Sequence, residues 1–251
     1  MRETTAIVLA AGKGTRMKSD LPKVLFPVLG RSMVHWVLDA LQEAGIQKKI
    51  VVVGYRADLV ESELAARSGV AFAVQKEQLG TGHAVKMCDD QLAHFDGSVL
   101  VVAGDSPLIQ VSSIRELVRS FEERELDCLL GTLHKDNPFG LGRIVRDSSG
   151  LFERIVEEKD ATPEERAITE VNMSMYLFRS ETLRWALGQL QNDNAQSEYY
   201  LTDTPRLLRE GGYKVDAISV LKGCESLSIN TIDELGMVEA KMQELGYPCV
   251  S

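Results

Sequence analysis

Short apolar runs and amphipathic stretches alternate along the first part of the chain. Four apolar runs have the length of a buried strand: Thr5–Ala10, Lys49–Val53, Val70–Val74 and Ser98–Ala103. Between them, apolar residues recur at every third or fourth position, which is typical of helices that pack through one face. The expected helices span residues 32–44, 59–66 and 82–92. This alternation predicts a mainly parallel central sheet that is flanked by helices on both faces.

The pattern changes after about residue 110, where the apolar runs become shorter. We expect strands at 128–133, 142–146, 151–157, 171–178 and 213–220, and helices at 181–191 and 231–245. Asp147–Gly150 has the composition of a hairpin turn, and the charge-rich segment 153–166 is expected on the surface. No linker rich in Gly, Ser or Pro and no internal repeat is visible. We therefore expect a single domain over residues 1–251.

Composition and charge narrow the class of protein. The chain has 251 residues, 44% of them hydrophobic, which is ordinary for a globular protein with a sizeable core. Its formal net charge is −9, which argues against nucleic acid as a partner, because such proteins neutralise phosphates with a broad basic surface. Nothing in the sequence indicates an oligomeric state.

Cysteine usage and the start of the chain bear on the compartment. The four cysteines lie far apart without a C-x-x-C pair, so neither a zinc motif nor a disulfide framework is expected. The apolar run Ala6–Ala11 is too short for a signal peptide or a transmembrane helix. We expect a soluble, cytoplasmic protein that does not bind membranes.

A glycine-containing loop directly follows the first expected strand. It reads Leu-Ala-Ala-Gly-Lys-Gly-Thr-Arg-Met over residues 9–17. Ligands of open α/β sheets bind at the carboxyl ends of strands, and small residues allow backbone N–H groups to approach an anion. The third glycine of a dinucleotide fingerprint is replaced by Met17, and the spacing of a Walker A loop is absent. A plain glycine-rich turn remains an alternative on this motif alone.

Positive charge gathers beside this loop. Five basic residues and a single acid, Asp20, lie between Lys13 and Arg31, although the whole chain is acidic. Pro22 interrupts any long helix here, so the segment is expected to wrap as a loop. Such a loop can surround a triphosphate, with Arg16 and Lys23 as cationic groups that stabilise charge developing during a displacement.

The loop together with Pro22-Lys23 resembles the signature of the sugar-phosphate nucleotidyltransferases. Within that family the chain is most similar to the uridylyltransferase domain of bacterial N-acetylglucosamine-1-phosphate uridylyltransferases, and further segments match in order along nearly the whole chain. The resemblance implies a Rossmann-like nucleotide-diphospho-sugar transferase fold with a smaller β-rich sugar-binding lobe. It divides the domain into a nucleotide-binding half (about 1–110), a sugar-phosphate half (111–229) and a closing helix (230–247).

The resemblance also implies where the nucleotide binds. The nucleotide-binding residues come from the loop and from the segment 75–84, which is similar to the family's uracil-reading segment: Leu9, Ala10, Ala11, Gly12, Gly14, Gln75, Gly80 and Thr81. A Gln amide can both donate to and accept from a pyrimidine edge. His83 follows in the same segment, but no carboxylate in the segment pairs with it, so a buried, hydrogen-bonded histidine is favoured over a direct catalytic role.

A metal site and a sugar site complete the expected machinery. Asp105 follows the strand 98–103, where a carboxylate can hold Mg²⁺ against a triphosphate, although a turn or capping role is the local alternative. The resemblance favours the metal and gives Asn230 as its second protein ligand. It also assigns the sugar-phosphate contacts, to Gly142, Glu157, Asn172 and Thr202.

Two positions depart from the family pattern. Ala103 stands where the family often has an aromatic residue, and Asn172-Met173-Ser174 replaces the usual Asn-Thr-Gly. Ser174 fills space that glycine leaves free, which bears on the sugar accepted more than on the type of reaction. Ala103 bears on packing beside the nucleotide.

The expected reaction is the transfer of a uridylyl group from UTP to N-acetylglucosamine 1-phosphate, which releases pyrophosphate. An oxygen of the sugar phosphate attacks the α-phosphorus in line, so no protein nucleophile is needed. Two alternatives stay open: the same chemistry with another sugar 1-phosphate or with dTTP, and a nucleotide-sugar sensor without turnover. Bifunctional family members continue into a hexapeptide-repeat acetyltransferase domain that this sequence lacks, so acetyl transfer is not predicted.

Overall fold

The computed structural model describes residues 2–17, 19–227, 229 and 231–249. Within them, a mixed sheet has the strand order β11-β7-β10-β6-β1-β4-β5, with β8 paired to β10 and β9 paired to β8. The strands of this sheet are β1 (Thr4–Ala10), β4 (Lys48–Val53), β5 (Val70–Val74), β6 (Ser98–Ala103), β7 (Cys128–His134), β8 (Gly142–Arg146), β9 (Phe152–Val156), β10 (Glu170–Arg179) and β11 (Val215–Ser219).

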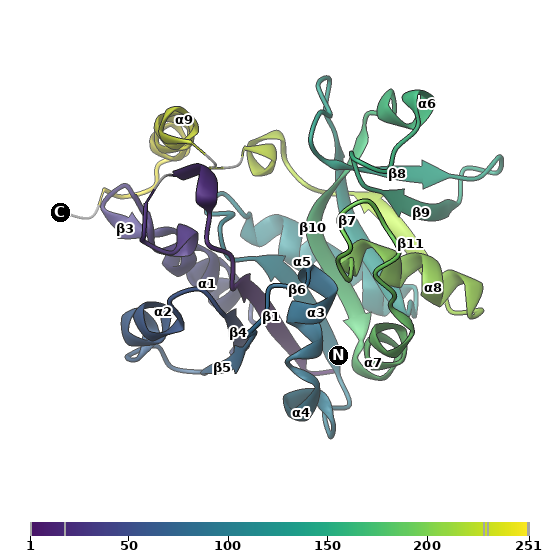
Figure 1. Cartoon of the computed structure of the whole chain (residues 1–251), viewed down its shortest axis with the longest axis horizontal. Helices are drawn as coiled ribbons and strands as arrows, with labels where there is room; N and C mark the ends of the chain where they lie inside the picture. The colour runs from purple at the N-terminus through teal and green to yellow at the C-terminus, as the bar shows by residue number, and fades with distance from the viewer. Residues whose placement is uncertain (1, 18, 228, 230, 250–251) are drawn as a thin grey trace.

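Helices cover both faces of the sheet (Figure 1). The α-helices are α1 (Met33–Glu43), α2 (Ala57–Leu64), α3 (Thr81–Lys86), α4 (Asp89–Leu92), α5 (Val111–Glu123), α6 (Pro163–Arg166), α7 (Ser180–Gln189), α8 (Thr204–Glu210) and α9 (Ile232–Glu244). None of the helices in the described residues is long and apolar enough to span a membrane.

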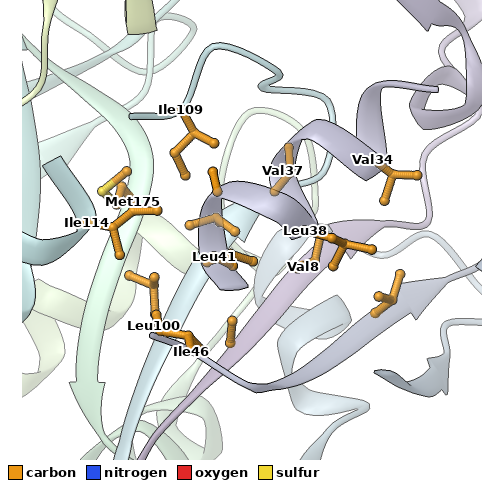
Figure 2. Close-up of a cluster of buried hydrophobic side chains, with 14 of the residues drawn as sticks. Val8, Val34, Val37, Leu38, Leu41, Ile46, Leu100, Ile109, Ile114 and Met175 are labelled. Atoms are coloured by element: carbon orange, nitrogen blue, oxygen red, sulfur yellow. The ribbon is translucent and has the colours of Figure 1, made fainter. Parts of the chain in front are cut away.

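β1 is buried on both sides, which explains why its sequence is apolar throughout. Ala6 and Val8 belong to one core cluster, which α1, α2 and α5 cover, whereas Ile7 between them belongs to a second cluster under α3, α7 and α8. Successive side chains of a strand point to opposite faces, so a strand between two helix layers needs an apolar residue at each position. Figure 2 shows the first cluster, in which Val8 and Leu100 lie with Leu38 and Leu41 of α1.

The expected parallel sheet is confirmed where the strand–helix alternation predicted it. β1 pairs in parallel with β4 and with β6, and β4 pairs in parallel with β5. β10 then enters antiparallel between β6 and β7, and it also pairs with β8 of the β8–β9 hairpin. Asp147–Gly150 forms the turn of that hairpin, as the sequence predicted, and the Gly150 N–H donates to the Asp147 carbonyl over 2.9 Å.

Several elements differ from the sequence expectation. The helix expected at 82–92 is two helices, α3 and α4, because the backbone leaves helical geometry at Cys88 (φ −90°, ψ 4°) and the buried side chain turns inward. α5, α6 and α8 were not predicted, and neither was the small two-stranded sheet of β2 (Pro27–Val28) and β3 (Arg31–Ser32). The apolar spacing of Ile114, Leu117 and Phe121 in α5 carried the helical signal, and all three are buried.

β10 contains a bulge that shapes the second half of the sheet. Asn172 pairs with Thr132, and the next pair in register is Met175 with Gly131, so residues 173 and 174 are extra. An insertion of this kind bends the strand and re-aims nearby side chains. Ser174 within it adopts a left-handed backbone conformation (φ 56°). The β8–β9 hairpin and α6 project beside this bulge and form the smaller β-rich lobe (Figure 1).

Candidate active site

The loop after β1 lies at the carboxyl ends of three neighbouring parallel strands. The Gly104 N–H, just beyond β6, donates to the Leu9 carbonyl over 2.9 Å, and the Tyr55 N–H, just beyond β4, donates to the Ala11 carbonyl over 3.0 Å. The start of the predicted nucleotide loop is therefore hydrogen-bonded to the segments that follow β6 and β4. Figure 1 shows this loop in purple, between α9 on one side and the β8–β9 lobe on the other.

Gly14 allows the loop to close onto Lys23. Its φ is +67°, and a Cβ at this position would lie 2.7 Å from the Lys23 Cβ. A side chain here would therefore strain the backbone and push Lys23 away. Arg16 lies one turn on, in the 3₁₀ helix Thr15–Met17, and is exposed to solvent. Lys23 begins a second 3₁₀ turn, Lys23–Leu25, directly after Pro22. The segment is a wrapping loop with short helical turns, as Pro22 predicted.

Lys23 and Asp105 form an ion pair. The Lys23 Nζ lies 2.6 Å from the Asp105 Oδ2, with side chains 15% and 28% exposed. The pair brings together the predicted cationic group and the predicted metal ligand, although 82 residues separate them in the sequence. The Asp105 carboxylate is partly exposed and offers oxygen ligands, which hard divalent cations such as Mg²⁺ and Ca²⁺ bind. Asn230, the second predicted ligand, lies outside the described residues.

The described residues hold no group of three or more His, Cys, Asp and Glu side chains that could bind a metal by themselves. Within these residues, Asp105 is therefore not part of a preformed all-protein metal site.

Not every basic residue near the loop faces it. Arg31 donates to the Asp39 carboxylate over 2.5 Å and lies over the Trp36 ring. Its charge therefore interacts with side chains of α1. Lys13 lies 5.0 Å from the centre of the Tyr55 ring. Hydrogen bonds from Arg67 and Arg31 hold the pKa of Asp39 below its usual value, although burial alone would raise it. The local positive charge is thus smaller than the sequence count indicated.

Gln75, Gly80 and Thr81 lie together beside the end of β5. The Gln75 side chain is 3% exposed, and its Nε2 donates to the Gly80 carbonyl over 3.0 Å. Gly80 has φ +107°, and a Cβ there would lie 2.6 Å from the Tyr199 carbonyl oxygen, so only glycine fits. The Thr81 hydroxyl accepts from the Leu201 N–H over 3.2 Å. The predicted base-reading segment is therefore a compact, preformed unit.

The sugar-side residues form a second group. Asn172 and Gly142 are register partners of β10 and β8, and the Thr202 hydroxyl donates to the Glu157 Oε1 over 2.9 Å. Burial raises the pKa of Glu157 above its ordinary value, and nearby Asp160 and Asp203 raise it further, although the Thr202 bond opposes this. Hydrogen bonds from hydroxyl groups stabilise the charged form of a carboxylate in such an environment, and a sugar ring supplies hydroxyl groups.

A cavity of about 530 Å³ opens next to Glu157 and Thr202. Its wall also contains Asp203, whose pKa burial raises, and Arg206. Asn172, Gly142 and Asp105 do not line it. The cavity therefore adjoins the predicted sugar side without spanning the whole site.

Sequence reasoning missed Tyr176, which lies under the sugar side. The Asn172 Nδ2 donates to the Tyr176 hydroxyl over 2.6 Å, and the Ser174 N–H donates to the Asn172 Oδ1 over 3.2 Å. Tyr176 is 1% exposed and stacks on Phe178, with ring centres 6.0 Å apart. Both ends of the Asn172 amide are thereby held. The β10 bulge creates this contact, because skipping two residues brings position 176 next to position 172 on one face of the strand.

The two departures from the family pattern meet in space. Ala103 at the end of β6 and Ser174 in the β10 bulge line the same small cavity, of about 20 Å³. Met173 and Glu225 also line it. Both the small side chain of Ala103 and the larger side chain of Ser174 therefore help to determine the shape of this one cavity.

Comparison with known proteins gives the family. A model described as nucleotidyl transferase matches residues 5–221. The bifunctional protein GlmU of Limosilactobacillus fermentum is 46% identical over 97% of this chain, and that of Streptococcus suis is 44% identical over 97%. The chain covers 53% of the length of each, so it spans about half of these relatives.

A solved structure of UDP-glucose pyrophosphorylase complexed with UDP-glucose superposes with a TM-score of 0.77. It covers 97% of this chain and 99% of that one at 15% identity, so it supports the nucleotide-diphospho-sugar transferase fold. Because the family model covers most of the sequence and the GlmU relatives are 44–46% identical to it, the chain belongs to the nucleotidyl transferase family.

Proposed function

We propose that the chain transfers a uridylyl group from UTP to N-acetylglucosamine 1-phosphate, giving UDP-N-acetylglucosamine and pyrophosphate. The observation that carries this proposal is the Lys23–Asp105 contact at the carboxyl ends of the central parallel strands, in a chain that also has the Gln75–Gly80 and Thr202–Glu157 hydrogen bonds. Membership of the nucleotidyl transferase family and the similarity to GlmU proteins support it.

On the nucleotide side, residues 9–14 give backbone groups to the triphosphate, and Gln75, Gly80 and Thr81 read the base. Small side chains at Ala10, Ala11 and Gly12 leave the N–H groups of this loop within reach of phosphate oxygens, as in other backbone anion sites. The fixed backbone of Gly80 supports the reading of a flat ring, because its place against the Tyr199 segment leaves little freedom of movement.

On the sugar side, Gly142, Glu157, Asn172 and Thr202 bind the amino-sugar phosphate. Glu157 accepts hydrogen bonds from ring hydroxyls, and Asn172 presents an amide to the N-acetyl or hydroxyl groups. The cavity beside Glu157 and Thr202 leaves room on this side of the site.

The reaction is an in-line displacement at the α-phosphorus, with pyrophosphate as the leaving group. Arg16 and Lys23 stabilise the negative charge that develops on the phosphates, and the two binding groups hold the attacking oxygen and the phosphorus in line. Asp105, with Asn230, is proposed to hold Mg²⁺, which when bound neutralises phosphate charge and orients the triphosphate. Lys23 leaves Asp105 for the phosphates as the nucleotide enters.

We also propose that residues 1–251 work as one nucleotidyltransferase domain. A shared core supports this, because Val8 and Leu41 of the first half lie in the same cluster as Leu129 and Val171 of the second. A cytoplasmic location is proposed as well, since all four cysteines are free thiols.

A turnover panel tests the proposed function. The chain is incubated with Mg²⁺, one of UTP, dTTP, CTP or ATP, and one of several sugar 1-phosphates, and pyrophosphate release is measured. We expect the highest kcat/KM with UTP and N-acetylglucosamine 1-phosphate. Turnover only with dTTP, or only with sugars that lack the N-acetyl group, would show that the proposed substrate pair is wrong. Nucleotide binding without turnover in any combination would identify a sensor.

A further inference from the structure

The Gln75 amide has a single orientation in this structure. Its Nε2 lies 3.0 Å from the Gly80 carbonyl oxygen. A carbonyl oxygen only accepts hydrogen bonds, so the amide atom that faces it must be the NH₂ group. Turning the amide over would place two oxygens against each other at a buried position, which is strongly unfavourable.

The same nitrogen fixes the tautomer of His83. Gln75 Nε2 lies 3.1 Å from His83 Nδ1. Because the NH₂ group donates, Nδ1 must accept, and the neutral ring therefore carries its proton on Nε2. One amide hydrogen is used by Gly80 and the other by His83. The Gln75 side chain then offers the acceptor Oε1 to a ligand.

The backbone holds His83 in this position. His83 lies in α3, where the Gly82 N–H donates to the Tyr199 carbonyl over 2.8 Å. The Tyr199 N–H donates back to the Leu79 carbonyl over 2.8 Å, and the His83 and Tyr199 rings lie 6.4 Å apart. The segment that carries His83 is thus held on both sides of Gly80, so the distance from His83 to Gln75 is set by the fold.

We propose that His83 is a specificity-determining positioning residue, which together with the Gly80 carbonyl orients Gln75 so that the site requires a base with an N–H donor at the edge it reads. This rests on the proposed function, in which Gln75 faces the base. Uracil and thymine present N3–H and satisfy Oε1. Cytosine presents a lone pair at N3, which faces the Gln75 oxygen and is rejected.

His83 does not touch the reacting atoms in this proposal. It acts through Gln75, and the reaction keeps its in-line course and its phosphate contacts. Removing the acceptor at Nδ1 takes away one of the two hydrogen bonds that hold the Gln75 amide, so turning the amide to present its NH₂ group to N3 of cytosine costs less. The predicted signature is therefore a change in the choice of base, with the sugar unaffected.

The test is a competition between UTP and CTP in one reaction with the sugar phosphate, with the two nucleotide sugars quantified together. The product ratio does not depend on how much enzyme is folded. For His83→Phe we expect the UTP preference to fall about tenfold, the equivalent of one hydrogen bond. His83→Asn places an amide oxygen near the former Nδ1 and is expected to restore the preference. His94→Phe, an exposed control on the surface, is expected to leave the ratio unchanged.

Two results would overturn the proposal. One is an unchanged UTP to CTP ratio in His83→Phe. The other needs no variant: ¹⁵N–¹H NMR of the wild-type imidazole rings that finds the His83 proton on Nδ1 would require the Gln75 oxygen to face it. The NMR measurement decides the matter if His83→Phe does not fold.

Calorimetric binding of UTP and CTP separates this proposal from the proposed function. If UTP binds more tightly than CTP and His83→Phe narrows the difference, the inference stands even where no sugar phosphate gives product. If product forms but the base preference ignores His83, the reaction stands and the inference fails.

Discussion

Lys23 and Asp105 lie in direct contact, with 2.6 Å between Nζ and Oδ2. The pair joins the wrapping loop after β1 to the end of β6, and both side chains are more than two-thirds covered. A lysine and a carboxylate at this distance neutralise each other, which makes the site less repulsive to a triphosphate than a lone Asp105 would be. The same pair must separate when a metal takes the carboxylate and the phosphates take the lysine.

Asp105→Asn is expected to lower kcat by about 100-fold or more, because a neutral amide binds a divalent cation weakly and charge on the phosphates stays uncompensated. The measurement is turnover against Mg²⁺ concentration, and the half-saturating concentration should rise. Asp96→Asn serves as the control, since Asp96 is 92% exposed and pairs with Arg2 far from the loop. Wild-type turnover of Asp105→Asn at low Mg²⁺ would contradict the metal assignment.

Gly14→Ala is expected to destabilise the fold by about 1–3 kcal/mol, since it combines a positive φ with a contact of 2.7 Å to Lys23. It should also lower kcat, because Lys23 is displaced. Thermal unfolding and turnover check the two effects. Gly12→Ala in the same loop is the control for stability alone, because no atom lies within 4 Å of its added Cβ. Equal melting temperatures for the two variants would disprove the strain argument.

Glu157→Gln is expected to stabilise the protein at neutral pH and to weaken sugar-phosphate use. Burial raises the pKa of Glu157 above its ordinary 4.5, so the folded state holds the proton more tightly than the unfolded state. The stability that this gives is present below the unfolded pKa and is lost as pH rises through the folded pKa. The uncharged amide escapes that loss. Its advantage in melting temperature should therefore shrink as the pH is lowered to 4.5 and below.

Glu153→Gln on β9, the strand that ends just before Glu157, is the matched control, because the Glu153 side chain is 39% exposed and pairs with Arg154. It should change neither the sugar-phosphate KM nor the pH dependence of stability. A stability gain in Glu157→Gln that is independent of pH would show that burial of the charge is not its cause.

Ser174→Gly is expected to be more stable than Ser174→Ala, by about 0.5–1 kcal/mol. Both variants lack the hydroxyl, so their difference isolates the cost of a side chain at φ 56° in the β10 bulge. Chemical denaturation of the two variants measures it. If alanine proved the more stable, the bulge would have to relax in solution to a different conformation.

Tyr176→Phe is expected to raise the KM for the sugar phosphate several-fold and to leave the KM for the nucleotide unchanged. The substitution keeps the stacking on Phe178 but removes the oxygen that the Asn172 amide donates to over 2.6 Å. Losing one buried acceptor costs about 1–3 kcal/mol, part of which appears as disorder of Asn172. Steady-state kinetics with each substrate varied in turn gives the split.

Tyr213→Phe is the control, since Tyr213 packs on Trp185 away from Asn172. If both KM values of Tyr176→Phe rose equally, Tyr176 would support the fold in general. It would not then orient the sugar-binding amide in particular.

The architecture of the first half was predictable because its three central strands, β1, β4 and β6, are buried on both faces. Continuous apolar runs such as Thr5–Ala10 and Ser98–Ala103 cannot be explained by one-sided burial, and the helical spacing between them predicted a parallel sheet. The boundary of the helix after Gly80 was wrong, because a change of backbone angle at Cys88 leaves no mark in the apolar pattern.

The sequence singled out the candidate site residues but not the contacts between them. The loop motif and Pro22-Lys23 pointed to Lys23, and the end of an apolar strand pointed to Asp105, yet their pairing depends on how two distant segments meet. The link from Asn172 to Tyr176 depends on a bulge of two residues, and hydrophobic patterning does not reveal bulges. Likewise, no pattern in segment 75–84 showed that Gln75 and His83 share a hydrogen bond.

The pairing of residues 79–82 with residues 199–201 connects the proposed base site to the proposed sugar site. Gly82 and Thr81 bond to Tyr199 and Leu201, and the next residue along the chain is Thr202, which bonds to Glu157. A base that shifts the first segment on binding would therefore also shift the second. By thermodynamic linkage, the factor by which bound nucleotide changes the affinity for sugar phosphate must equal the factor by which bound sugar phosphate changes the affinity for nucleotide.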